Sequence, residues 1–128
     1  MDAALRIELI TPFVDALQEA FATLASMDLQ RKEIYVKEGV EMFGKFNGII
    51  GLSGGTLGTC VLSLSQEMAE EMVRSRFIMP SDQTVTESAI VEGVGDLVNL
   101  IARGAQKRLS STPYRFEIAS PTVLLGDK

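Results

Sequence analysis

Four polar residues in one stretch of the chain are spaced so that a helix would bring them to a single face. They are Glu92, Asp96, Asn99 and Arg103, at intervals of i, i+4, i+7 and i+11. At about 100° per residue, this spacing predicts a band roughly 60° wide. Two carboxylates, an amide and a guanidinium on one surface can act by charge and by hydrogen bonding. We call these four residues the polar stripe.

The sequence around the polar stripe carries the signals of one long helix over residues 84–111. Thr84 and Glu87 are typical of a capping box at a helix start. Lys107 and Arg108 stand where a helix C-terminus favours cations. Apolar residues recur on the other side of this helix, which we expect to face the core: Ile90, Val94, Leu97, Ile101 and Ala105, with Val91, Val98 and Leu109 beside them.

Two interpretations of the polar stripe stay open. The first is a solvated helix face, stabilised by pairs such as Glu92 or Asn99 with Arg103. The second is a functional surface, since asparagine and aspartate are mediocre residues for a helix interior. The three glycines of the same helix each cost it about 1 kcal/mol relative to alanine. Gly93 and Gly104 lie beside the stripe, where either a partner approaches the backbone or a neighbouring element packs tightly.

Composition limits the class of protein and the class of partner. A chain of 128 residues with 46% hydrophobic residues predicts one folded domain, residues 1–128. Its 12 basic and 17 acidic residues give a net charge of −5, with no long basic cluster. This balance argues against nucleic acid or an anionic membrane as the main partner. We expect a protein or a small molecule as partner.

The chain has one cysteine, Cys60, and no histidine. An intrachain disulfide, a zinc site of the usual spacing and a Cys-His nucleophile are therefore excluded, and Cys60 is interpreted as a buried thiol. We expect no cofactor and no metal of its own. The N-terminus has no basic leader and no apolar run approaches about 18 residues, so we expect a cytoplasmic protein.

The remaining elements follow from periodicity and turn signals. Residues 11–27 predict an amphipathic helix, with Thr11 as N-cap and Pro12 in the first turn. Alternation at Ile34 and Val36 indicates extended chain, and residues 43–52 and 56–64 predict a hairpin. The connecting Ser-Gly-Gly lacks the lysine of a phosphate-binding loop, so it is interpreted as a turn.

The last part of the chain predicts one more short helix and two short strands. Ser65 can cap a helix with an acidic first turn. Residues 114–118 alternate as a strand, Pro121 interrupts the pattern, and residues 122–125 form a short apolar run. The order of helix, strands, two helices and strand indicates an α/β protein.

Several blocks of the chain resemble, in order, the CheX and CheC phosphatases of bacterial chemotaxis. The blocks are GIIGLSGGTLGTCVLSLS, EGVGDLVNLIARGA and YRFEIASPTVLLG. The resemblance is closer to CheX, because a single helix motif is present. The family motif is Glu-x-x-Asn with a proline further along; here it reads Asp96-Leu97-Val98-Asn99, with Pro121 downstream. The resemblance implies an α+β fold, in which an antiparallel-rich sheet packs against a long central helix and two further helices.

The resemblance also implies an activity: removal of the phosphoryl group from the aspartyl phosphate of a CheY-like receiver domain. In that chemistry the acidic residue, here Asp96, pairs with a lysine of the receiver, and Asn99 orients a water in line with the phosphorus. Glu92 and Arg103 are expected to bind the partner. The Mg²⁺ would belong to the receiver. Such a reaction needs positioning and charge stabilisation rather than a protein nucleophile.

Two departures from the family pattern modify these expectations. Position 96 is Asp instead of Glu, which brings the carboxylate one methylene closer to the helix and predicts weak activity. The chain ends at Lys128, so we expect the family's last C-terminal strands to be lacking. The alternative to a phosphatase is a noncatalytic relative that binds a receiver or a motor-switch component. The resemblance, together with an expected free sheet edge, also predicts a homodimer.

Overall fold

The sheet is arranged around one long central strand. The computed structural model describes residues 7–25, 44–80 and 82–126. Strand β1 (Phe46–Gly54) pairs with β2 (Gly58–Leu64) on one side, and with β3 (Phe116–Ile118) and β4 (Thr122–Leu125) on the other. All pairs are antiparallel, and β3 and β4 follow one another along different parts of β1. This confirms the predicted α+β fold with an antiparallel sheet.

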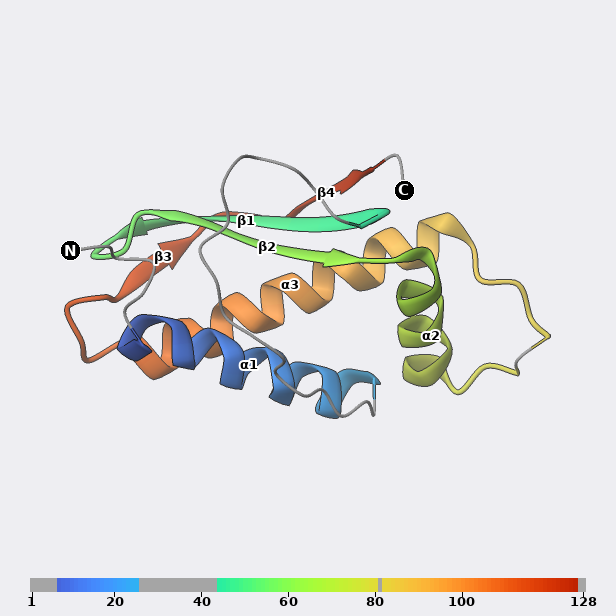
Figure 1. Ribbon diagram of the computed structural model, residues 1–128, viewed down its shortest axis with the longest axis horizontal. Helices are drawn as coiled ribbons and strands as arrows, with labels where there is room; N and C mark the ends of the chain where they lie inside the picture. The colour runs from blue at the N-terminus through green and yellow to red at the C-terminus, as the bar shows by residue number, and fades with distance from the viewer. Residues whose placement is uncertain (1–6, 26–43, 81, 127–128) are drawn as a thin grey trace.

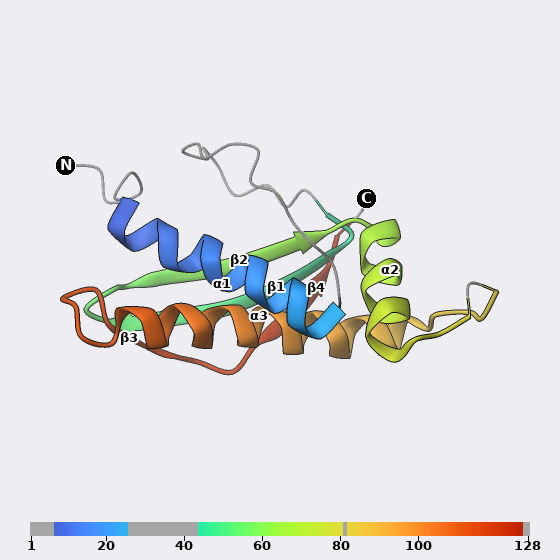
Figure 2. The same ribbon diagram turned by 90° about the horizontal axis from the view of Figure 1, so that it is seen from below.

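Three helices lie on one face of this sheet. Helix α1 (Ile7–Ala25) and helix α3 (Glu87–Leu109) run side by side beneath it, and α2 (Gln66–Phe77) stands at one end (Figures 1 and 2). Helix α3 contacts the other two helices and all four strands, so it is the central helix of the fold. Among the described residues, Glu92, Asp96 and Arg103 of the polar stripe are on the exposed part of α3.

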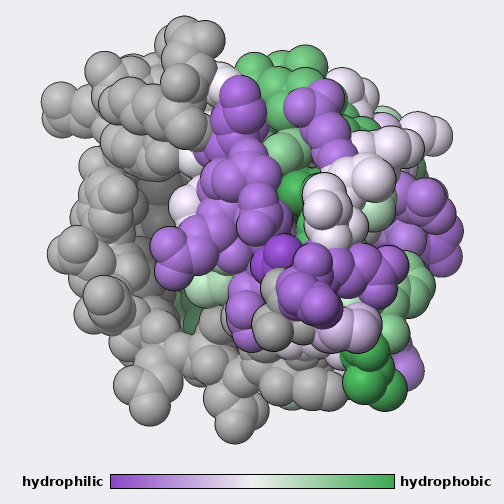
Figure 3. Space-filling model, turned by 90° about the vertical axis from the view of Figure 1, so that its right-hand side faces the viewer, coloured by the Kyte–Doolittle hydropathy of each residue, from purple (hydrophilic) through white to green (hydrophobic). Residues whose placement is uncertain are grey.

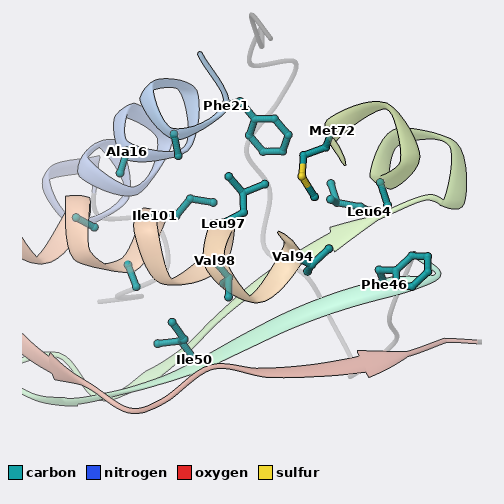
Figure 4. Close-up of a cluster of buried hydrophobic side chains, with 14 of the residues drawn as sticks. Ala16, Phe21, Phe46, Ile50, Leu64, Met72, Val94, Leu97, Val98 and Ile101 are labelled. Atoms are coloured by element: carbon teal, nitrogen blue, oxygen red, sulfur yellow. The ribbon is translucent and has the colours of Figure 1, made fainter. Parts of the chain in front are cut away.

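The hydrophobic core lies between α3, the sheet and the other helices. The predicted apolar face of α3 is buried, except that Val91 is only partly buried. Ile50 of β1 faces Val98 of α3, and Met72 of α2 points toward Leu97 (Figure 4). Gly48 lets the helix approach β1, since an added Cβ would lie 3.0 Å from the Val98 side chain. These contacts confirm the core prediction for the long helix.

Helix α3 begins later than the capping-box pattern predicts. Thr86 is the N-cap, and its hydroxyl oxygen accepts a hydrogen bond from the Ala89 N–H at 3.2 Å. The prediction of Thr84 as the cap was therefore wrong. Val85, the residue before Thr86, packs against the core. A hydrophobic residue at this position fixes the angle at which the chain enters the helix. The C-terminal end agrees with the sequence, since Lys107 and Arg108 lie in the last turn.

Helix α1 extends further toward the N-terminus than predicted. Its first described residue is Ile7, so Thr11 is not an N-cap and Pro12 lies inside the helix. The reason is that Leu9 and Phe13, four residues apart, both pack against the core and prolong the apolar face beyond the proline. The predicted end at residues 26–27 and the extended chain at Ile34 and Val36 lie outside the described residues.

The predicted hairpin is confirmed, but its turn lies at residues 55–57 and not at residues 53–55, because β1 continues through Gly54. Gly54 adopts a φ of 106°, which favours glycine, and a Cβ on Gly55 would strike the Pro113 carbonyl. The loop therefore serves packing and chain reversal. Strand β4 has the predicted bounds, but β3 begins only at Phe116, because residues 112–115 form a turn in which the Arg115 N–H donates to the Thr112 carbonyl at 3.3 Å.

Helix α2 starts as predicted and ends in a strained turn. Ser65 is the N-cap and accepts from the Met68 N–H at 3.1 Å. At the other end, Ile78 has φ 52° and ψ 50°, and the Met79 N–H donates to the Arg74 carbonyl at 3.0 Å. This is the hydrogen bond of a Schellman motif, in which glycine usually occupies the left-handed position. Isoleucine there costs about 1–2 kcal/mol.

Candidate functional site

The polar stripe lies on α3, away from the buried face of that helix. Glu92, Asp96 and Arg103 are exposed, and Asn99 is half-buried. The two residues of the acid-x-x-amide motif are one helical turn apart, so their side chains project side by side. The structure thus brings Asp96 and Asn99 together on one accessible surface.

Asp96 already has a partner within the chain. Its Oδ2 lies 3.1 Å from a guanidinium nitrogen of Arg76 in the last turn of α2. The Asp96 side chain remains 50% exposed, and that of Arg76 is 24% exposed. The Arg76 guanidinium also lies over the Phe77 ring, 5.0 Å from its centroid. One carboxylate oxygen of Asp96 is therefore engaged by α2, and Oδ1 accepts no hydrogen bond from the described residues.

Asn99 makes no hydrogen bond to any group in residues 7–25, 44–80 or 82–126. Its amide has one acceptor oxygen and two donor hydrogens. A half-buried amide with no partner among the described residues can donate to one group and accept from a water at the same time. This is the feature of the polar stripe best suited to orienting a small molecule.

Arg103 lies at the other end of the polar stripe, where α3 meets α1. It lines a shallow depression together with Lys107 and Arg108, while Glu19 of α1 pairs with Arg108 at 2.6 Å. Within the described part of the chain, Arg103 forms no ion pair with Glu92. The pairs of Glu92 or Asn99 with Arg103, which a solvated helix face predicts, are thus not formed among these residues.

The two glycines beside the stripe are explained by helix packing. A Cβ on Gly93 would lie 3.1 Å from the Met72 terminal carbon, and one on Gly104 would lie 2.9 Å from the Ala16 Cβ. The first contact is with α2 and the second with α1. Tight packing of neighbouring helices, which was one of the two interpretations, therefore accounts for both positions.

Cys60 is not suited to nucleophilic chemistry. It is half-buried between α1 and the hairpin, next to apolar residues such as Phe13. Burial raises the pKa of its thiol to about 11, so the thiolate is scarce near neutral pH. The described residues also hold no cluster of three or more side chains of the types Asp, Glu, Cys or His that could bind a metal.

Sequence reasoning missed Arg76. Its contact with Asp96 joins residues 20 apart in the chain and depends on how α2 packs on α3. A signal was available: Arg76 follows the buried Met72 by four residues, on the side of α2 that turns toward α3. A cation on that side of a predicted helix could have been matched with the acids of the polar stripe.

Comparison with known protein families identifies the family of this chain. The family model described as chemotaxis phosphatase CheX matches residues 46–128, which include both residues of the motif. The chain belongs to the CheX family. No curated protein matches the chain in sequence.

Solved structures of CheX and CheC-like proteins have the same fold. A CheX chemotaxis protein from Desulfovibrio desulfuricans is 26% identical, with a TM-score of 0.84 over 94% of this chain and 79% of that one. A CheC-like superfamily protein from Shewanella sp. PV-4 is 27% identical, with a TM-score of 0.84 over 95% and 79%.

A third structure resembles this CheX-family chain in fold alone. It is the complex of CheX with CheY, BeF₃ and Mg²⁺ from Borrelia burgdorferi, 21% identical, with a TM-score of 0.73 over 95% of this chain and 79% of that one. In the present chain, none of the described helices is long and apolar enough to cross a membrane.

Proposed function

We propose that this CheX-family protein dephosphorylates the aspartyl phosphate of a CheY-like receiver domain. The observation that carries the proposal is the half-buried Asn99 amide, which has no hydrogen-bond partner among the described residues and lies one turn from the exposed carboxylate of Asp96. Further support comes from the solved CheX of the same fold that is bound to CheY with BeF₃ and Mg²⁺.

In the proposed reaction, α3 docks against the phosphorylated site of the receiver. The Asn99 amide donates to or accepts from a water and holds it in line with the phosphorus. The water oxygen forms the new bond to phosphorus as the bond from phosphorus to the receiver's aspartate oxygen breaks. The products are inorganic phosphate and a free carboxylate. The Mg²⁺ that offsets charge on the phosphoryl oxygens is held by the receiver.

Asp96 acts in docking. Its carboxylate pairs with the lysine of the receiver, either through the open Oδ1 or after displacing Arg76 from Oδ2. Glu92 and Arg103 extend the contact at the two ends of the polar stripe. Because Arg76 competes for the same carboxylate, and because aspartate is shorter than glutamate, we expect a modest rate.

The second candidate is a noncatalytic relative that binds a receiver or a motor-switch component. The observation that favours it is the engagement of the short Asp96 side chain by Arg76. In that case the protein binds its partner through α3 without accelerating hydrolysis.

Phosphate loss from purified receivers separates the two candidates. Each CheY-like receiver of the same organism is phosphorylated, and its decay is followed with and without this protein. A phosphatase shortens the lifetime of at least one phosphorylated receiver in proportion to the protein concentration. Binding without any change in lifetime identifies the noncatalytic relative, and neither binding nor acceleration with any receiver contradicts both.

A further inference from the structure

The last turn of α2 exposes two large apolar side chains. Phe77 is 58% exposed and Ile78 is 90% exposed. They stand at the C-terminal end of α2. The face of the molecule that includes α2 shows separate patches of hydrophobic residues among hydrophilic ones (Figure 3). Exposed apolar side chains of this size do not contribute to the core and call for another explanation when they occur side by side.

Ile78 is also unfavourable for the fold. It holds the left-handed position of the Schellman motif with a φ of 52°, where a β-branched residue is strained and glycine is preferred. Neither burial nor backbone preference therefore explains an isoleucine at this position. Strained residues of this kind tend to persist where a surface has a function.

The apolar turn is continuous with the polar stripe. Arg76 connects the two, because its guanidinium contacts the Asp96 carboxylate at 3.1 Å and lies over the Phe77 ring at 5.0 Å. A surface made only of exposed charges gives orientation and a fast encounter but little affinity. Affinity in protein interfaces comes mainly from a few apolar or aromatic anchors that become buried. Phe77 and Ile78 supply such anchors next to Asp96.

We propose that the C-terminal turn of α2 completes the docking surface for the receiver domain. Phe77 and Ile78 are covered by apolar side chains of the receiver that lie next to its lysine, while Asp96 takes the lysine itself. The partner is a receiver rather than a second copy of this chain, because the turn adjoins the polar stripe through Arg76. This inference rests on the proposed function and adds the residues that give the receiver complex its affinity.

The test uses the substitution Ile78→Gly, whose effects on stability and on docking have opposite signs. Removal of strain raises the unfolding midpoint, whereas loss of the anchor weakens binding by about tenfold. Binding is measured by calorimetry with CheY-like receivers loaded with Mg²⁺ and beryllofluoride. The matched control is Leu57→Ser, which removes an apolar side chain that is 85% exposed in the hairpin turn. Leu57→Ser leaves receiver affinity unchanged.

Phe77→Ala provides a second variant and is expected to weaken binding severalfold. Wild-type affinity in both Ile78→Gly and Phe77→Ala overturns the proposed docking surface. This result does not contradict the proposed function if the wild-type protein still dephosphorylates the receiver. A lower unfolding midpoint for Ile78→Gly overturns it as well, because the isoleucine then serves the fold. A wild-type protein that binds no receiver contradicts the proposed function and this inference together.

Discussion

At the scale of single residues, the Asp96 carboxylate has two competing cationic partners. Arg76 holds one oxygen in the free protein, and a receiver lysine would need the same group. We predict that Asp96→Glu raises kcat/KM severalfold, because the added methylene carries the carboxylate outward from α3. A close interfacial charge pair is worth about 1.5 kcal/mol or more when the groups meet. The measurement is the rate of phosphate loss from one receiver at several receiver concentrations.

The control for that prediction compares the two acids of the stripe. If Asp96 is the docking acid, Asp96→Asn lowers the rate more than Glu92→Gln does. The reverse order means that Glu92, longer and one turn earlier, makes the contact. Unchanged rates in all three variants contradict docking through either acid and favour a solvated helix face.

Arg76 gives a second prediction at the same scale. Arg76→Met removes the competing cation while keeping an unbranched side chain over Phe77. We expect faster association with the receiver at low salt, because the lysine no longer meets a like charge beside Asp96. The exposed pair contributes less than about 1 kcal/mol to stability, so folding is retained.

Association rates at two salt concentrations check this prediction. Arg115→Met, on an exposed site away from the polar stripe, makes the same change of charge and serves as control. Slower association in Arg76→Met than in the control would mean that Arg76 orients Asp96 for docking instead of competing for it.

At the scale of elements, the glycines of α3 control how closely the helices pack. We predict that Gly104→Ala destabilises the protein, because the new Cβ would lie 2.9 Å from the Ala16 Cβ, which cannot turn aside. Gly93→Ala should cost less, since the nearest atom belongs to the flexible end of Met72. Gly95→Ala is the control: its nearest neighbour, Val123, is at 3.6 Å, so the better helix propensity of alanine adds up to about 1 kcal/mol.

Denaturant unfolding of the three alanine variants measures these differences. Equal stability of Gly104→Ala and Gly95→Ala would contradict the close contact of α1 with α3. Stabilisation by Gly104→Ala would also mean that this glycine is kept for a partner that approaches α3 and not for packing against Ala16.

The elements show how far the sequence could predict the fold and the site. Helix existence and the faces of α3 follow from periodicity, so the buried and the accessible sides of α3 were predicted correctly, and the roles of the polar stripe stay predictions. The helix boundaries depended on tertiary contacts. Val85 packs against the core, and α3 begins after Thr86 instead of Thr84. Leu9 also packs against the core, and α1 therefore extends to the N-terminal side of Pro12. The Arg76 contact required the packing of α2 on α3, which local patterns do not encode.

At the scale of the whole molecule, β2 is an edge strand of the sheet. Among the described strands it pairs with β1 alone. Open strand edges tend to be covered or paired. We predict a homodimer in solution, and light scattering at micromolar concentration measures it. Val61→Lys, on the exposed part of β2, should shift the protein toward the monomer. A folded wild-type protein that is entirely monomeric would contradict the prediction.

The central claim is that Asn99 orients the attacking water on a receiver bound through α3. The most direct test is Asn99→Ala, assayed for phosphate loss from the receiver and for binding to the same receiver with beryllofluoride and Mg²⁺. We predict that the acceleration disappears, that binding persists, and that the free energy of unfolding stays within about 1 kcal/mol of wild type, as expected for a helix site on the surface. Full acceleration by Asn99→Ala, with normal folding, would contradict the claim.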